Sequence, residues 1–143
     1  MAKIFISCPT PEPMITCGST LRGKLERRGH AGYIASNHPK YGHPISDKIK
    51  YEIDASDLLI ALLFKKSSGF VFQETGYAEG RTPVVYMVER GVTDVGGFMQ
   101  DREYEPFTVD DFSSSAERIS SRIPDILARY AAENRPVGTS GHP

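Results

Sequence analysis

The fold is decided by residues 57–86, DLLIALLFKKSSGFVFQETGYAEGRTPVVY. Leu58–Phe64 is an uninterrupted apolar run, typical of a central parallel strand that is buried on both faces. A polar loop and a short helical pattern over Gly69–Gly80 follow, and Pro83–Val88 reads as a second buried strand. This order predicts two parallel strands joined by a right-handed crossover. Glu74 then lies near the start of the helix, beside the carboxyl end of the first strand, where ligands bind in open parallel sheets.

Strands and helices alternate in the same way along the rest of the chain. Further strands are predicted over Lys3–Ser7, His30–Ala35 and Glu103–Val109. Further helices are predicted from Ser19 or Thr20 to Arg28, over Ser46–Ala55 with Ser46 as its cap, and over Ser113–Glu133. Pro106 places the last strand at a sheet edge, and Pro124 is expected to kink the last helix. We therefore predict an α/β protein, a flavodoxin-like three-layer α/β/α sandwich with a parallel sheet of four to five strands.

Length and composition predict one globular domain. We place it at residues 1–133, and expect 134–143 to be a disordered tail. The net charge of -1 does not favour a nucleic-acid partner, and the clustered basic residues fit a solvated helix face: Arg22, Lys24, Arg27 and Arg28. The longest apolar run has seven residues, whereas a membrane helix needs about 20, so no membrane association is expected. With no leader pattern at the start, we expect a cytoplasmic protein.

Cysteine and histidine patterns do not predict a metal site. Cys8 and Cys17 are nine residues apart, a spacing that matches no zinc pattern and fits a reduced compartment. The four histidines, His30, His38, His43 and His142, lack the spacing of metal ligands. Two interpretations of Cys8 remain open, a nucleophile or a buried thiol.

Three predicted strand ends converge at one edge of the sheet. They bring together the loop after Ser7, the loop around Asn37 and the loop that leads to Glu74. In the predicted helix, Phe70, Glu74 and Tyr77 share a face because they follow i, i+4, i+7 spacing. A carboxylate in an aromatic cleft suits the cleavage of an N-glycosidic bond, whose transition state resembles an oxocarbenium ion. Phe70 or Tyr77 is then a candidate to stack on a base.

A simpler interpretation of Glu74 also stands. A glutamate in the first turn of a helix interacts favourably with the helix dipole, which contributes about 0.3–1 kcal/mol and requires no catalytic role. Helical spacing does not distinguish these two interpretations.

Three motifs resemble TIR domains. Lys3-Ile-Phe-Ile-Ser7 looks like their opening strand, and Ile49-x-x-x-Ile53-x-x-Ser56-Asp57 is similar to their middle section. Val71-x-Gln73-Glu74-x-Gly76-x-Ala78, followed by Pro83-Val84-Val85, resembles the bacterial segment around the family's glutamate. The resemblance spans residues 3–90. It differs in two places: Cys8-Pro9 replaces the usual His or Tyr after the strand-one Ser, and the chain has no tryptophan.

The resemblance implies a function. Enzymatic TIR domains cleave NAD⁺ between nicotinamide and ribose, and bacterial members of antiphage systems such as Thoeris make ADP-ribose-derived signals. Carried to this sequence, it implies that Glu74 is catalytic, that Ser7 and Cys8 lie by the substrate, and that Phe70 is near the family's tryptophan. It further implies NAD⁺ as a substrate with no bound cofactor, a homo-oligomer whose neighbouring subunit completes the site, and a separate effector that senses the product. The loop Pro39–Pro44 is a candidate subunit contact.

Two other hypotheses stay open. Nucleoside 2-deoxyribosyltransferases also have a Ser/Ala-Asp before a buried strand and a Glu-x-Gly-x-Ala helix, which here are Ser56-Asp57 and Glu74–Ala78. They usually carry Asp-x-Gly-Thr before the glutamate, where this chain has Ser67–Phe72. A transferase or an N-glycoside hydrolase would use Glu74 as its nucleophile. A non-enzymatic nucleotide-binding signalling module is the third hypothesis.

Overall fold

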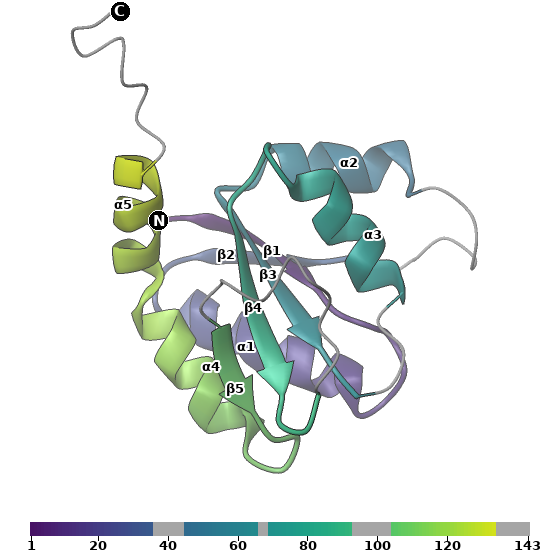
Figure 1. Ribbon diagram of the computed structural model, residues 1–143. Helices are drawn as coiled ribbons and strands as arrows, with labels where there is room; N and C mark the ends of the chain where they lie inside the picture. Colours follow the sequence, from purple (N-terminus) through teal and green to yellow (C-terminus); the bar gives the residue numbers. More distant parts are fainter. Residues whose placement is uncertain (36–44, 66–68, 93–103, 134–143) are drawn as a thin grey trace, which may run out of the picture.

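A five-stranded, fully parallel sheet forms the centre of the computed structural model, which describes residues 1–35, 45–65, 69–92 and 104–133 (Figure 1). The strands are β1 (Lys3–Ser7), β2 (Ala31–Ile34), β3 (Leu58–Leu63), β4 (Val84–Glu89) and β5 (Tyr104–Phe107). The helices are α1 (Met14–Arg27), α2 (Asp47–Asp54), α3 (Gly69–Ala78), α4 (Phe112–Ser121) and α5 (Ile123–Glu133). The strand order β2-β1-β3-β4-β5 is that of flavodoxin-like folds, so the predicted fold class is confirmed.

Two helical layers cover the sheet. One core lies beneath α1 and α4 and contains Ile4 and Ile6 of β1, whereas Phe5 belongs to the core beneath α2 and α3 (Figure 1). This division follows from the alternation of side chains along a strand. All six residues of β3 are buried, as expected of a central parallel strand with helices on both faces.

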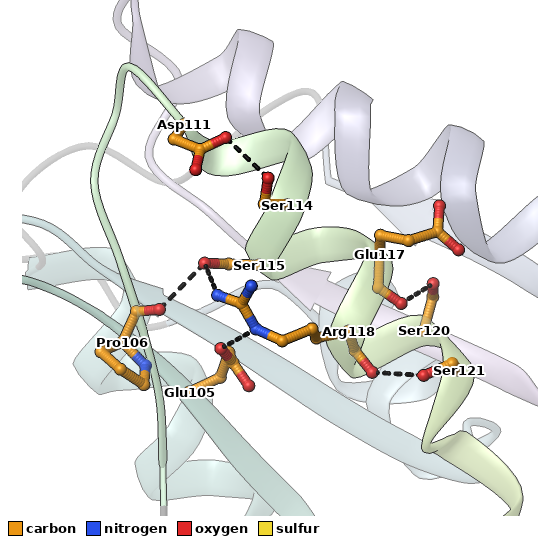
Figure 2. Close-up of polar contacts among 9 residues, drawn as sticks. All are labelled: Glu105, Pro106, Asp111, Ser114, Ser115, Glu117, Arg118, Ser120 and Ser121. Atoms are coloured by element: carbon orange, nitrogen blue, oxygen red, sulfur yellow. Dashed lines mark hydrogen bonds and ion pairs between the residues drawn. The ribbon is translucent and has the colours of Figure 1, made fainter.

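The edge strand β5 is attached to α4 by a polar network (Figure 2). Ser115 Oγ donates to the carbonyl oxygen of Pro106 at 2.9 Å, and Arg118 Nε donates to Glu105 Oε2 at 3.0 Å. Arg118 Nη2 also donates to Ser115 Oγ at 3.0 Å. The predicted edge position of this strand is confirmed, since β5 pairs with β4 alone in the described sheet. These hydrogen bonds attach β5 to α4 in addition to its pairing with β4.

The start of α1 differs from the sequence prediction. The helix begins at Met14 rather than at Ser19 or Thr20. The carbonyl oxygen of Pro11 accepts hydrogen bonds from the amides of Met14 (2.9 Å) and Ile15 (3.2 Å), so the proline-rich segment turns directly into the helix. Prolines are tolerated there because the first helical amides have no intrahelical partner.

The other helix ends are closer to expectation. Ser46 caps α2 as predicted, because its Oγ accepts a hydrogen bond from the amide of Ile49 at 3.2 Å. The last predicted helix is not merely kinked but divided into α4 and α5, which meet at Arg122. Pro124 is the second residue of α5, where its missing N–H costs no helical bond. The expected disordered tail, 134–143, lies outside the described residues.

Candidate functional site

A hydrogen bond between Ser7 and Glu74 joins the first strand to the third helix. Ser7 Oγ donates to Glu74 Oε1, and both residues are 0% exposed. Ser7 is the last residue of β1, and its partner in β3 is Ala61. In this strand order, the chain reverses direction across the sheet between β1 and β3, and ligands of such folds bind at that point outside the carboxyl ends. The sequence predicted both residues for the site, and the structure brings them into contact.

Glu74 lies deeper in its helix than the sequence predicted. It is the sixth residue of α3, whose first turn contains no acidic residue. The effect of the helix dipole falls off within the first turn, so the dipole does not account for a carboxylate at this position. Burial of a charged group is costly unless it is hydrogen-bonded. The simpler interpretation of Glu74 therefore loses its structural basis.

A row of three residues crosses the sheet at the level of this contact. Ser7 of β1 pairs with Ala61 of β3, and Ala61 pairs with Tyr86 of β4. Ala61 and Tyr86 both belong to the core beneath α2 and α3, and Tyr86 is buried. Sequence reasoning missed Tyr86 as a neighbour of the site. The available signal was that Tyr86 is the one hydroxyl-bearing side chain in the apolar run Pro83–Val88.

Cys8 faces the opposite layer of the sheet. Its Sγ donates to the carbonyl oxygens of Pro9 (3.2 Å) and Met14 (3.1 Å), and it belongs to the core beneath α1 and α4. Burial, with a smaller contribution from Cys17, raises the pKa of Cys8 to about 12. A thiol in this state is a poor nucleophile at neutral pH. The structure therefore does not bring Cys8 together with Glu74, and it favours the interpretation of Cys8 as a buried thiol.

Tyr77 is directed toward α2. Its hydroxyl donates to Asp54 Oδ2 at 2.7 Å, and the guanidinium carbon of Arg81 lies 4.6 Å from its ring centroid. These contacts connect Tyr77 with the last residue of α2 and with the segment that follows α3. The other two predicted contacts are not described in the same detail. Phe70 belongs to the first turn of α3, but its side chain lies outside the description, and Asn37 lies outside the described residues.

A separate cavity of about 520 Å³ opens at the other edge of the sheet, where β4 and β5 begin. Its lining includes Val84, Tyr104, Ile119 and Arg122, and neither Ser7 nor Glu74 contributes to it. The volume is in the range of small-molecule sites. Its lining residue Glu105 is already paired with Arg118 at 3.0 Å. We therefore base the candidate site on the buried carboxylate and not on the cavity.

The described part of the chain offers neither a metal centre nor a membrane-spanning helix. No three His, Cys, Asp or Glu side chains there are grouped so that they could hold a metal ion. Among the same residues, no helix has the length and apolar character needed to cross a membrane.

Comparisons with known proteins give similarity at the level of structure. No family model matches this chain, and a search of curated proteins finds no match. One similar solved structure is a 2-deoxyribosyltransferase from the psychrotolerant bacterium Bacillus psychrosaccharolyticus, with a TM-score of 0.55 and 17% identity over 78% of this chain and 90% of that one. Another is the TIR domains of the activated Roq1 resistosome, which directly recognises the pathogen effector XopQ. It has a TM-score of 0.50 and 14% identity over 94% of this chain and 99% of that one.

Sequence identities of 17% and 14% support a shared fold but do not show a shared activity. The two structures nevertheless represent the two families that the sequence motifs resemble. This chain has the α/β fold that a TIR domain and a nucleoside-transferring enzyme share.

Proposed function

We propose that this protein is an NAD⁺ nucleosidase or cyclase that cleaves the bond between nicotinamide and ribose. The observation that carries the proposal is the buried carboxylate of Glu74, which accepts a hydrogen bond from Ser7 at the point where the strand order reverses between β1 and β3. The resemblance of the Glu74 segment to bacterial TIR domains and the similarity to a solved TIR domain support it.

The chemistry follows from the charge that develops on the ribose. The bond from C1′ to the nicotinamide nitrogen breaks, and its electron pair leaves with nicotinamide, which becomes neutral. The positive charge passes to the ribose as an oxocarbenium ion, which Glu74 stabilises with its fixed negative charge. A nucleophile then bonds to C1′ and loses its proton. Water gives ADP-ribose, and a nucleophile within the same molecule gives a cyclic product.

The position of Glu74 suits this role. In a site from which water is excluded, an ionic interaction is several times stronger than in bulk water. A carboxylate that is already fixed in place needs little reorganisation as the charge develops. NAD⁺ is in this proposal a substrate, and no resident cofactor takes part.

The biological role that we propose is signalling in the cytoplasm, in antiphage defence. The ADP-ribose-derived product is the signal, and a separate effector protein recognises it. The similar TIR domains belong to a resistosome, which supports the further proposal that this chain acts as a homo-oligomer.

A nucleoside 2-deoxyribosyltransferase is the second candidate. The similarity to a solved 2-deoxyribosyltransferase favours it, with a TM-score of 0.55 against 0.50 for the TIR domains. In this reaction Glu74 attacks C1′ of a deoxynucleoside, the base leaves, and a second base takes the sugar from the enzyme. An N-glycoside hydrolase would use water in the last step. A nucleotide-binding module without turnover is the third candidate.

The decisive experiment is a mass-resolved assay of NAD⁺ with purified protein at low and high protein concentrations. We expect release of nicotinamide together with ADP-ribose or an isomer of cyclic ADP-ribose, with a higher specific activity at high concentration if the site requires a neighbouring subunit. Glu74→Gln should reduce the rate by at least about a hundredfold, as the loss of one transition-state contact does in other enzymes. Glu79→Gln is the matched control, because Glu79 is an exposed glutamate just beyond the same helix.

Three results would redirect the assignment. Equal rates for the Glu74→Gln variant and the parent would remove Glu74 from the mechanism. Base exchange between deoxynucleosides without NAD⁺ turnover would select the transferase. Tight binding of NAD⁺ with no product at any concentration would select the binding module.

A further inference from the structure

We propose that Ser7 is the positioning residue of this site, and that Ala61 maintains the space in which Ser7 and Glu74 meet. The inference rests on the proposed role of Glu74 in glycosidic cleavage and extends it. It also changes the expected role of Ser7, from a substrate contact to a support for the reacting carboxylate.

The sheet fixes the position of the Ser7 hydroxyl. β1 lies between β2 and β3, and its residues pair on both sides, with Ile6 opposite Ile34 and Ser7 opposite Ala61. The hydroxyl therefore projects from the end of an interior strand of the sheet. Glu74 is on a helix 67 residues further along the chain, so their hydrogen bond fixes α3 relative to the central strand at the level of the carboxylate.

The direction of the hydrogen bond defines what Ser7 can do. An ionised carboxylate only accepts, so the single hydroxyl hydrogen of Ser7 is donated to Glu74 Oε1. That hydrogen is then not available to a substrate. A hydrogen bond of this kind favours the charged form of a buried carboxylate, which burial alone disfavours. It also restricts rotation of the carboxylate, so that one orientation is presented to the substrate.

Ala61 explains why this contact fits beneath α3. The β3 run Leu58–Leu63 is LLIALL, and Ala61 is its one small residue. Its neighbours on the same face are Leu59 and Leu63, both part of the core beneath α2 and α3. Ala61 lies beside Ser7 on the adjacent strand. A larger side chain at this position would occupy space next to the Ser7–Glu74 hydrogen bond.

The test compares Ser7→Ala, Ser7→Thr and the parent protein, each labelled with ¹³C at the glutamate carboxyl carbon. The Glu74 resonance is assigned by its absence in Glu74→Gln. In Ser7→Ala we expect this resonance to change its chemical shift at neutral pH, because the carboxylate has lost its hydrogen-bond donor. Ser7→Thr retains a hydroxyl and should restore most of the difference. An unchanged chemical shift in Ser7→Ala would overturn the proposal.

Kinetics separate positioning from substrate binding. At neutral pH, Ser7→Ala should lower kcat by about 10- to 100-fold, as a slightly misplaced catalytic group does, and leave KM within about threefold. A rise in KM with an unchanged kcat would mean that Ser7 contacts the substrate instead, and would contradict the proposal.

A second pair of variants tests the role of Ala61. Ala61→Val should displace the Glu74 carboxyl resonance as Ser7→Ala does. Ala116→Val is the matched control, because Ala116 is a fully buried alanine of α4 in the opposite layer. An equal effect of the two variants on the Glu74 resonance would contradict a specific role for Ala61. If Ser7→Ala folds poorly, Ser7→Cys preserves the volume with a weaker donor and should give an intermediate shift.

The two proposals can fail separately. The carbon spectrum requires no turnover, so it tests Ser7 even if NAD⁺ is not a substrate. A Glu74 resonance that depends on Ser7, in a protein that cleaves neither NAD⁺ nor deoxynucleosides, would leave the role of Ser7 intact and overturn the proposed function. NAD⁺ cleavage that depends on Glu74 but not on Ser7 would do the reverse.

Discussion

Ser7 and Cys8 are neighbours in the chain, yet their side chains serve opposite layers of the sheet. Ser7 contacts a carboxylate that a distant helix supplies, in the layer of α2 and α3. Cys8 is enclosed in the layer of α1 and α4, and its thiol donates to carbonyl oxygens within six residues of it. One layer thus combines its core with a polar contact between distant segments, whereas the hydrogen bonds of Cys8 in the other layer are local. The comparison implies that activity and stability can be disturbed separately, layer by layer.

The reactivity of the thiols provides the largest contrast with an ordinary surface residue. Burial raises the pKa of Cys8 from 9.0 to about 12, which lowers its thiolate fraction at neutral pH roughly a thousandfold. Burial also raises the pKa of Cys17, to about 11. We expect a thiol reagent at pH 8 to label both cysteines of the native protein at least about a hundredfold more slowly than in denaturant.

The control for this prediction is the same chain in guanidinium chloride, where both thiols should react at the rate of a free cysteine. Rapid labelling of Cys8 in the native protein would show that the layer of α1 and α4 is open. Loss of NAD⁺ cleavage on such labelling, or in Cys8→Ala, would restore Cys8 as a functional residue and contradict the division between the layers.

A cavity in the closed layer should reduce stability and leave the activity of folded molecules unchanged. Leu21 of α1 is fully buried in that layer. Leu21→Ala should lower the free energy of unfolding by about 3 kcal/mol, as large-to-small substitutions in protein cores do. A domain of this size is stable by roughly 5–15 kcal/mol, so most molecules should remain folded. Urea unfolding followed by circular dichroism measures the change.

The matched assay measures kcat of Leu21→Ala at a temperature at which the variant is folded. A kcat within about twofold of the parent agrees with separate layers. A tenfold loss at full folding would mean that α1 influences Glu74 across the sheet, and the comparison between the layers would then fail.

The sequence predicted the sheet better than the helix ends. Runs such as Leu58–Leu63 are apolar on both faces, which few environments other than a central parallel strand allow. The start of α1 was predicted five or six residues too late, at Ser19 or Thr20 instead of Met14, because a serine or threonine is the usual helix cap and here Pro13 takes the cap position. The break at Arg122 was read as a kink, because sequence does not show how far a proline displaces the chain after it.

The sequence also predicted part of the candidate site, namely the residues at the strand ends. Glu74 and Ser7 were both named, since strand ends converge at one edge of a parallel sheet. The alternation along β1 places Ser7 with Phe5 and Cys8 with Ile6, and applying it would have separated Ser7 from Cys8 in advance. The contact of Tyr77 with Asp54 depends on how α3 packs against α2, and helical spacing within one element contains no information on that.

The smallest predicted effect concerns the outer surface of the closed layer, where Glu117 of α4 pairs with Arg28 and with Lys24 of α1. The hydrogen bond from Arg28, followed by that from Lys24, holds the pKa of Glu117 below its ordinary value of 4.5. A carboxyl group whose pKa is lowered by folding stabilises the native state above the ordinary value, and this contribution is lost as the pH falls through the lowered value. The parent should therefore be slightly more stable than Glu117→Gln at pH 7. The difference in stability should vanish in acid and diminish in 1 M salt, because exposed ion pairs are weak and screened.

Urea unfolding from acid to neutral pH measures this difference, and Glu26→Gln on the exposed side of α1 is the control. A difference that persists in acid would mean that Glu117 acts through packing between α1 and α4 and not through its charge.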